Sequence, residues 1–165
     1  QEAMSSQDKG LCDDASEAWL MAQGLPDPFE MAGWIPGRDL HQWPLAAQHI
    51  YVLVDLINQV TSNGFSGWCC NGYASRWRLT IEACTAVGAD EAAAQVQEAI
   101  DAFGPFDGMS ESAIADRLKG PQGSELQHAL HGPTGQFWDD HDQLRVRMAR
   151  YMAGHRKLFE MMRPI

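Results

Sequence analysis

Histidines near the end of the chain are the residues whose type and spacing come nearest to a metal site. His128 and His131 lie three residues apart, and His141 follows them. Imidazole nitrogens bind zinc and other transition metals when several meet at one point. Gly132 and Pro133 are expected to end the helix of the first pair, and no HExxH spacing occurs. We therefore interpret these histidines as solvated side chains near helix ends, with a small metal-binding protein or enzyme as the alternative.

Aspartates surround the third histidine, and they have a simpler explanation than catalysis. Asp139, Asp140 and Asp142 precede three arginines of the same predicted helix. Carboxylates in a first turn and cations in later turns both complement the helix macrodipole. We therefore expect these aspartates at the beginning of a helix.

Nucleophilic and phosphate-binding motifs are absent from the sequence. It contains no GxSxG, no P-loop and no GxGxxG. The four cysteines include one adjacent pair and no CxxC, a pattern that favours small buried hydrophobic residues in a reduced compartment: Cys12, Cys69, Cys70 and Cys84. We therefore predict a protein that is not an enzyme and uses neither a metal nor another cofactor.

Charge is distributed very unevenly along the 165 residues. Residues 1–143 hold 21 of the 22 carboxylates and six Lys or Arg, a formal charge of −15. Residues 144–165 hold six cations and Glu160, a formal charge of +5. A net charge this far from zero opposes compaction, so it favours a role in solubility or in binding. The acidic part predicts a basic protein surface as partner, and it would repel nucleic acid itself.

Candidate partner-binding residues are carboxylates at helical spacing and in the loop that precedes the longest apolar helix. Trp34 joins them, because an aromatic in a Pro-rich loop is a good interface anchor. Plain solvation is the alternative for any one of these acidic groups. The candidates are Asp13, Asp14, Glu17, Asp27, Glu30, Trp34, Asp39, Glu91, Glu98, Asp101, Asp107, Glu111 and Asp116.

Cations of the last predicted helix are expected outside this binding surface. Arg145 and Arg147 would repel a basic partner. We expect them to complement carboxylates of this chain or of a second copy in a homodimer.

Hydrophobic periodicity predicts an all-α fold of roughly seven helices in a single compact domain, 1–165. The strongest signal covers 45–61, where apolar residues recur every three or four positions. Further helices are expected over 11–23, 73–87, 90–103, 110–119, 124–131 and 136–162. No segment alternates in the manner of a half-buried strand. A Pro/Trp-rich loop is expected near 24–44.

Glycine, asparagine and aspartate mark the expected ends of these helices. The segment 62–72 should break the central helix, with Gly64 the residue expected to need positive φ. Gly24, Gly88 and Gly154 are expected to end or weaken others. N-caps are predicted at Asp13, Asp14 and Asp90.

The N-terminus shows no basic region followed by an apolar stretch, and no apolar run reaches 18 residues. We therefore expect a cytoplasmic protein without a membrane segment. Residues 1–10 are expected to be flexible, with Met4 as a native start behind a short vector-derived scar.

The segment 45–103 resembles the bacterial DNA-mimic protein family. The similarity rests on an apolar helix ending at Val60, the break Ser62-Asn63-Gly64-Phe65, then Trp68, Asn71, Val87-Gly88-Ala89 and an Ala-rich helix. The resemblance implies an all-helical fold, frequent dimers, no cofactor and no catalysis. It also implies that surface carboxylates bind a protein that would otherwise hold DNA.

Two biological settings agree with this reading. The protein could antagonise a DNA-binding transcription regulator, or it could be an immunity protein that neutralises a nuclease toxin. Both partners are basic, and both would associate faster through electrostatic steering. The remaining alternatives are the histidine-based metal protein or enzyme and a structural helical adaptor.

Overall fold

The computed structural model describes residues 16–104 and 107–164, and these form one all-helical domain. The expectation for 1–10 and the caps at Asp13 and Asp14 fall outside the described residues. The α-helices are α1 (Ser16–Ala22), α2 (Pro28–Ala32), α3 (Leu45–Cys70), α4 (Trp77–Ala86), α5 (Asp90–Phe103), α6 (Glu111–Lys119), α7 (Gly123–Gly154) and α8 (Arg156–Met161). Two 3-10 helices, η3 (Gly37–Gln42) and η4 (Tyr73–Arg76), lie between them.

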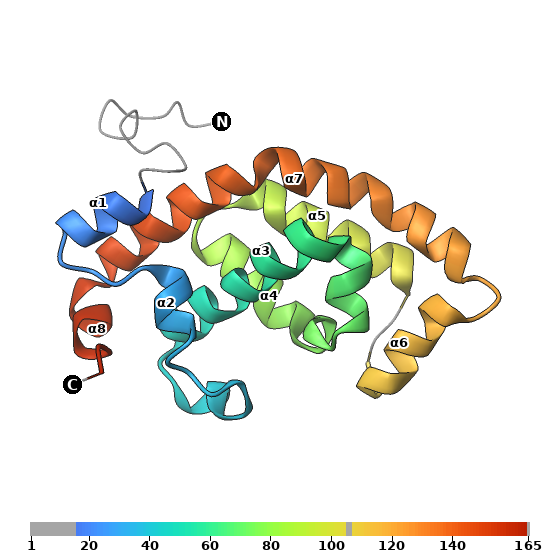
Figure 1. The fold of residues 1–165 in the computed structure, drawn as a ribbon, viewed down its shortest axis with the longest axis horizontal. Coiled ribbons are helices and arrows are strands. Elements are labelled where there is room, and N and C mark those ends of the chain that lie inside the picture. The colour runs from blue at the N-terminus through green and yellow to red at the C-terminus, as the bar shows by residue number, and fades with distance from the viewer. Residues whose placement is uncertain (1–15, 105–106, 165) are drawn as a thin grey trace.

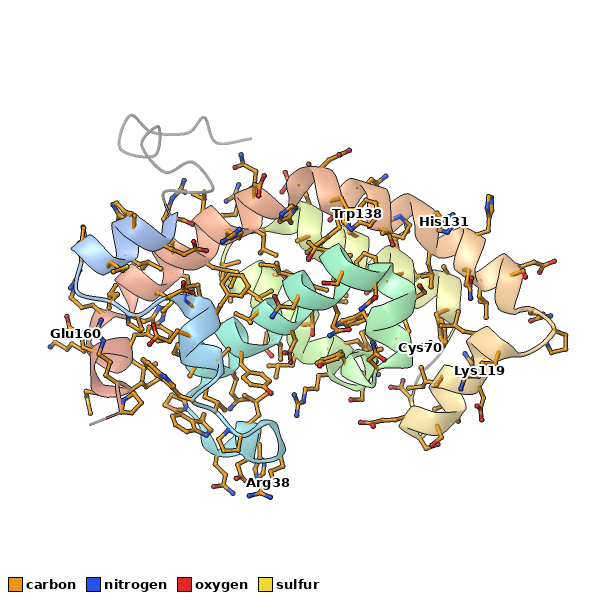
Figure 2. All side chains as sticks on the ribbon, in the orientation of Figure 1. Arg38, Cys70, Lys119, His131, Trp138 and Glu160 are labelled. Carbon is orange, nitrogen blue, oxygen red and sulfur yellow. The ribbon has the colours of Figure 1, made fainter. Side chains whose placement is uncertain are left out.

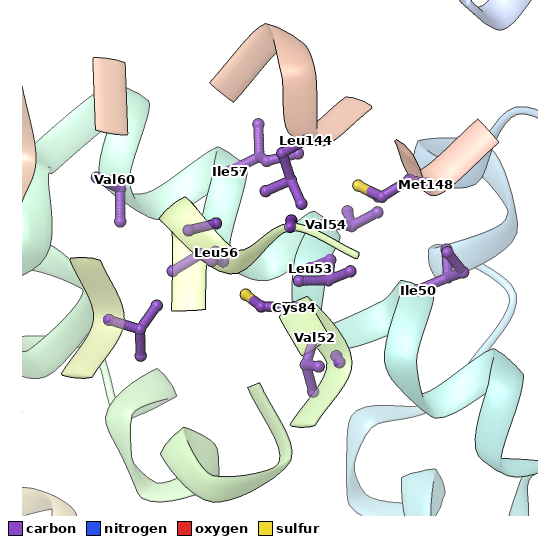
Figure 3. Packing of buried hydrophobic residues seen from close by; sticks show 14 of the residues in the cluster. Ile50, Val52, Leu53, Val54, Leu56, Ile57, Val60, Cys84, Leu144 and Met148 are labelled. Atoms are coloured by element: carbon purple, nitrogen blue, oxygen red, sulfur yellow. The ribbon is translucent and has the colours of Figure 1, made fainter. Parts of the chain in front are cut away.

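Helix α3 is the centre of the domain because its apolar residues occur on almost every side. Ile50, Leu53, Ile57 and Val60 are buried as the periodicity predicts, and so is Leu56 on another face. α3 packs against α2, α4, α6 and α7. Figure 3 shows side chains of α3 meeting those of α4 and α7 in one continuous core.

Helix α7 arches across the domain and connects its two ends (Figure 1). It packs on α5 and α3 along its middle, on α6 near its beginning and on α1 and α8 near its end. The expected stop at Gly132-Pro133 is wrong, since α7 continues through Pro133, which is buried. The weak point expected at Gly154 is confirmed, because α7 ends there and α8 follows.

A kink in α3 occurs where the sequence predicts a break, but it is far shorter than 62–72. Gly64 has φ 69° and ψ −179°, and the helix resumes at once and continues to Cys70. This region of backbone conformation is open essentially to glycine alone. A bond from outside the helix holds the kink: the buried Phe65 N–H donates to Thr134 Oγ1 of α7 at 3.0 Å. The Asn-Gly-Phe pattern therefore builds a junction between two helices.

Two other local predictions have different outcomes. Gly24 and Gly88 follow helix ends with positive φ, as helix-terminating glycines do. Asp90 is wrong as an N-cap, because it is the first helical residue and the capping position belongs to Ala89, which makes no side-chain cap bond. A carboxylate in the first turn still complements the helix dipole without capping it.

No helix of the described residues is long and apolar enough to cross a membrane. Cys69 and Cys84 are buried and free, as expected for small hydrophobic side chains, and burial raises the pKa of both thiols. Cys12 lies outside the described residues.

Candidate partner-binding surface

Carboxylates of α5 and α7 lie together on one side of the domain. Glu91, Glu98 and Asp101 are exposed on α5, whose opposite face packs into the core. Gln95 Nε2 donates to Asp140 Oδ2 at 2.9 Å, which joins an exposed aspartate of α7 to this surface. We call Glu91, Glu98, Asp101 and Asp140 the acidic strip.

Within the described part of the chain, none of these four carboxylates forms an ion pair. Their polar contacts are with neutral amides, since Gln97 Nε2 donates to Asp101 Oδ1 at 2.9 Å just as Gln95 contacts Asp140. Arg147 lines the same groove as Glu91 and Asp140 but makes no ion pair with them. The strip therefore presents carboxylates without an ion-pair partner in the described structure, with Arg147 as a cation in the same groove.

The aspartates predicted at the beginning of the last helix lie instead in the middle of α7. The macrodipole explanation for Asp139, Asp140 and Asp142 is therefore wrong, because the dipole effect falls off within the first turn. The side chains of Asp139 and Asp140 are exposed. Asp142 lies 3.2 Å from His141 Nε2 on the same helix.

Of the candidate partner-binding carboxylates in and near α6, Asp107 forms an ion pair with an arginine, whereas Glu111 and Asp116 form none with the described residues. Arg78 holds Asp107 through two bonds of 2.5 and 2.7 Å, and these bonds lower the pKa of Asp107 while stabilising its charge. Glu111 lies against Gly72, and Asp116 is exposed on α6. Asp107 thus already has a cation, which reduces its value for a partner.

Candidates in the N-terminal third occupy several different places. Asp27 caps α2 by accepting from Phe29 N at 2.7 Å, and Glu30 is exposed on that short helix. Asp39 lies 3.7 Å from Arg38, and Trp34 is half-buried against the core. Asp13 and Asp14 lie outside the described residues.

Glu17 accepts from the guanidinium of Arg145, which joins α1 to α7. Arg156 in turn donates to the Gln23 carbonyl at the end of α1 and to Glu160 in α8. Arg145 thus binds a carboxylate of this chain, as predicted, and Arg156 binds groups of the chain as well. Arg147 differs from the prediction, because it forms no ion pair with the described residues and lines the groove that contains Glu91 and Asp140.

A cleft between α1, α2, α3 and α7 was not predicted from the sequence. Its volume is about 630 Å³, and its lining includes Glu17, Asp27, Phe29, Trp138 and Arg145. The Trp138 side chain is 51% exposed, an unusual state for the largest apolar residue. Its indole N–H donates to the Val60 carbonyl at 2.8 Å, so the ring is fixed in place. The sequence signal that could have indicated this cleft was Trp138, a large apolar residue directly before two aspartates in a predicted helix.

The histidines give no metal site in the described residues, where no group of three or more His, Cys, Asp or Glu could hold an ion. His128 and His131 are both exposed, with ring centroids 5.8 Å apart. Figure 2 shows His131 and Trp138 at successive positions along α7. The metal-based alternative therefore has no supporting geometry among these histidines.

Comparison with known proteins gives one match. The family model described as DMP19-like protein matches residues 41–155, which extends beyond the expected core of 45–103 on both sides. No curated protein and no solved structure matches the chain. Because the matched segment is more than half of the sequence and includes all of α3 to α7, the chain belongs to the DMP19-like protein family.

Proposed function

We propose that this protein is a non-enzymatic DNA mimic that binds a basic, nucleic-acid-binding protein and keeps it from DNA. Two independent observations support this proposal. The family to which the chain belongs is a DNA-mimic family. The acidic strip supplies the chemistry that such a role needs, because its carboxylates are exposed and unpaired in the described residues.

The unpaired state of the strip is the observation that carries the proposal. Glu91 and Asp101 lie about 15 Å apart along the α5 axis at 1.5 Å per residue. Duplex DNA carries about nine phosphate charges over that length on its two strands. The strip thus presents a row of negative charges, as DNA does, at a lower density than the duplex.

Electrostatic steering explains how the strip would act. Exposed charges of one sign raise the association rate with a surface of the opposite sign, and salt screens this effect over about 8 Å at physiological ionic strength. A transcription regulator and a nuclease toxin both have such a surface. The partner class is therefore a protein whose DNA-binding surface is blocked by the mimic, in either setting.

Capture on the immobilised protein from a lysate of its native host, with a salt gradient for elution, tests the proposal. The captured protein is identified by mass spectrometry and mixed with a fluorescent DNA duplex. We expect that adding the mimic releases the duplex, and that the mimic alone does not bind it.

A charge-matched pair of variants separates the strip from general acidity. Glu91→Gln/Glu98→Gln/Asp101→Asn should weaken the release of DNA. Glu30→Gln/Asp116→Asn/Glu125→Gln removes three exposed charges elsewhere and should have a smaller effect. Equal effects would assign the binding to net charge, and direct binding of DNA would reject the mimic.

A further inference from the structure

The cleft beside Trp138 repeats a chemical pattern that the protein itself already uses. Within the cleft, the Arg145 guanidinium lies 5.2 Å from the centroid of the Phe29 ring and binds Glu17. An aromatic face and a carboxylate thus together hold a guanidinium. Cation–π attraction and a charge-assisted hydrogen bond favour this arrangement.

The same cleft also contains a second aromatic ring and a second carboxylate. Trp138 supplies a ring that is 51% exposed, and Asp27 supplies a carboxylate. Asp27 Oδ1 accepts from Phe29 N, and no ion pair joins this carboxylate to Arg145, to His141 or to any other described residue. Both components are held in place, since Trp138 is bonded to Val60 and Asp27 caps α2.

We propose that Asp27 and Trp138 of this cleft bind one arginine side chain from the basic partner, an inference that rests on the proposed function. Arginine fits better than lysine because its planar fork can bind a carboxylate through two N–H groups and stack on an indole. The partner is expected to use arginines against DNA phosphates as well. The cleft volume of about 630 Å³ leaves space for the backbone that carries the side chain.

The position of the cleft agrees with such an anchor. Trp138 lies two residues before Asp140 on α7, so the cleft and the acidic strip flank the same helix. Interfaces are dominated by a few buried aromatic or arginine contacts, whereas exposed charges mainly affect the association rate. The strip would thus attract the partner and the cleft would hold it.

A peptide titration tests the cleft without any knowledge of the partner. The probe is N-acetyl-Gly-Arg-Gly-amide, added to ¹⁵N-labelled protein while NMR spectra are recorded. We expect saturable shifts of the Trp138 indole N–H and of the Phe29 amide. The matched citrulline peptide has the same shape without the charge and should give no comparable shift. The lysine peptide should bind more weakly than the arginine peptide.

Three variants make the test specific. Asp27→Asn retains a side-chain oxygen for the α2 cap and removes the charge, so the arginine peptide should bind about tenfold more weakly. Trp138→Leu should weaken binding about two- to fivefold, followed at the Phe29 amide. Glu98→Gln removes one strip charge outside the cleft and should leave peptide binding nearly unchanged.

Four results would overturn the inference: no shift at the cleft, equal shifts with arginine and citrulline, lysine binding as well as arginine, or shifts confined to α5. None of them affects the release of DNA from the captured partner, which tests the proposed function separately.

Discussion

Helix α7 has contrasting neighbours on two of its sides. Toward α3, its Thr134 and Trp138 bond to the backbone of the kinked helix, at Phe65 and Val60. Toward α5, its Asp140 joins a strip of exposed carboxylates that form no ion pair within the described residues. Helix α7 packs on both helices, but the exposed carboxylates on the α5 side repel one another and lower stability.

This contrast separates the residues that carry the family resemblance from those of the proposed activity. The Asn63-Gly64-Phe65 segment carries the family resemblance, yet Gly64 and Phe65 are buried and cannot contact a partner. The strip carries the charge, and the hydrogen bond of Asp140 with Gln95 is its link between helices in the described residues. Changes on the α3 side should therefore alter stability, and changes on the α5 side should alter binding.

Gly64→Val should give the largest loss of stability. Its φ of 69° suits glycine, and a Cβ there would lie 3.2 Å from Thr134 Cγ2. We expect the free energy of unfolding to fall by about 1–3 kcal/mol or more in urea titrations. Gly135→Ala is the control, because nothing lies within 4 Å of its Cβ position. An unchanged urea midpoint in Gly64→Val would mean that the kink is not needed.

Thr134→Val tests the bond that holds the kink. The substitution keeps the shape of the side chain but removes the acceptor for the buried Phe65 N–H. An unsatisfied buried donor costs about 1–3 kcal/mol, so unfolding should become easier by that amount. Thr134→Ser keeps the hydroxyl and should retain more of the stability. If valine and serine behave alike, the hydrogen bond contributes nothing measurable.

Asp55 extends the comparison to a different kind of carboxylate, because its side chain is partly buried whereas those of the acidic strip are exposed. Burial raises its pKa to about 6, although Arg76 at 4.0 Å opposes the shift. A folded pKa above the ordinary value means that stability is present at low pH and lost as pH rises through 6. Asp55→Asn should therefore raise the free energy of unfolding by about 1–2 kcal/mol at pH 8.

The gain from Asp55→Asn should disappear near pH 4, where Asp55 is largely protonated. Unfolding curves of both proteins from pH 4 to pH 8 measure this. A constant difference at all pH values would show that Asp55 does not titrate as its burial indicates.

Neutralising the strip should have the smallest effect on stability. In Glu91→Gln/Glu98→Gln/Asp101→Asn the removed charges are exposed and unpaired, so the unfolding free energy should change by no more than about 0.5 kcal/mol. Relief of repulsion favours a small increase. A large loss in thermal or urea unfolding would show that these carboxylates support the fold instead.

Much of the fold follows from local sequence signals. Apolar spacing over 45–61 predicts the buried α3, and Gly64 and Gly154 mark the kink and the end of α7. Local rules failed at Pro133, because a buried proline can remain in a helix when tertiary packing outweighs the lost bond. That error also placed Asp139 and Asp140 at a helix beginning.

The candidate surface could be predicted only in part. Glu91, Glu98 and Asp101 follow from their spacing on one helix, and the structure adds Asp140 through a contact with Gln95 45 residues away. The pairing of Glu17 with Arg145 spans 128 residues, so no local pattern could show that this candidate is already neutralised. The place of Trp138 in a cleft could not be predicted, because the cleft depends on where α1 and α2 pack against α3 and α7.

The association rate with the captured partner, measured against salt concentration, tests the central claim most directly. For the unmodified protein the rate should fall steeply as salt rises, because screening removes the steering by the strip. For Glu91→Gln/Glu98→Gln/Asp101→Asn the rate should be lower at low salt and should depend less on salt, while the fold is unchanged. Identical rates and salt dependence for the two proteins would contradict the claim that the acidic strip is the binding surface.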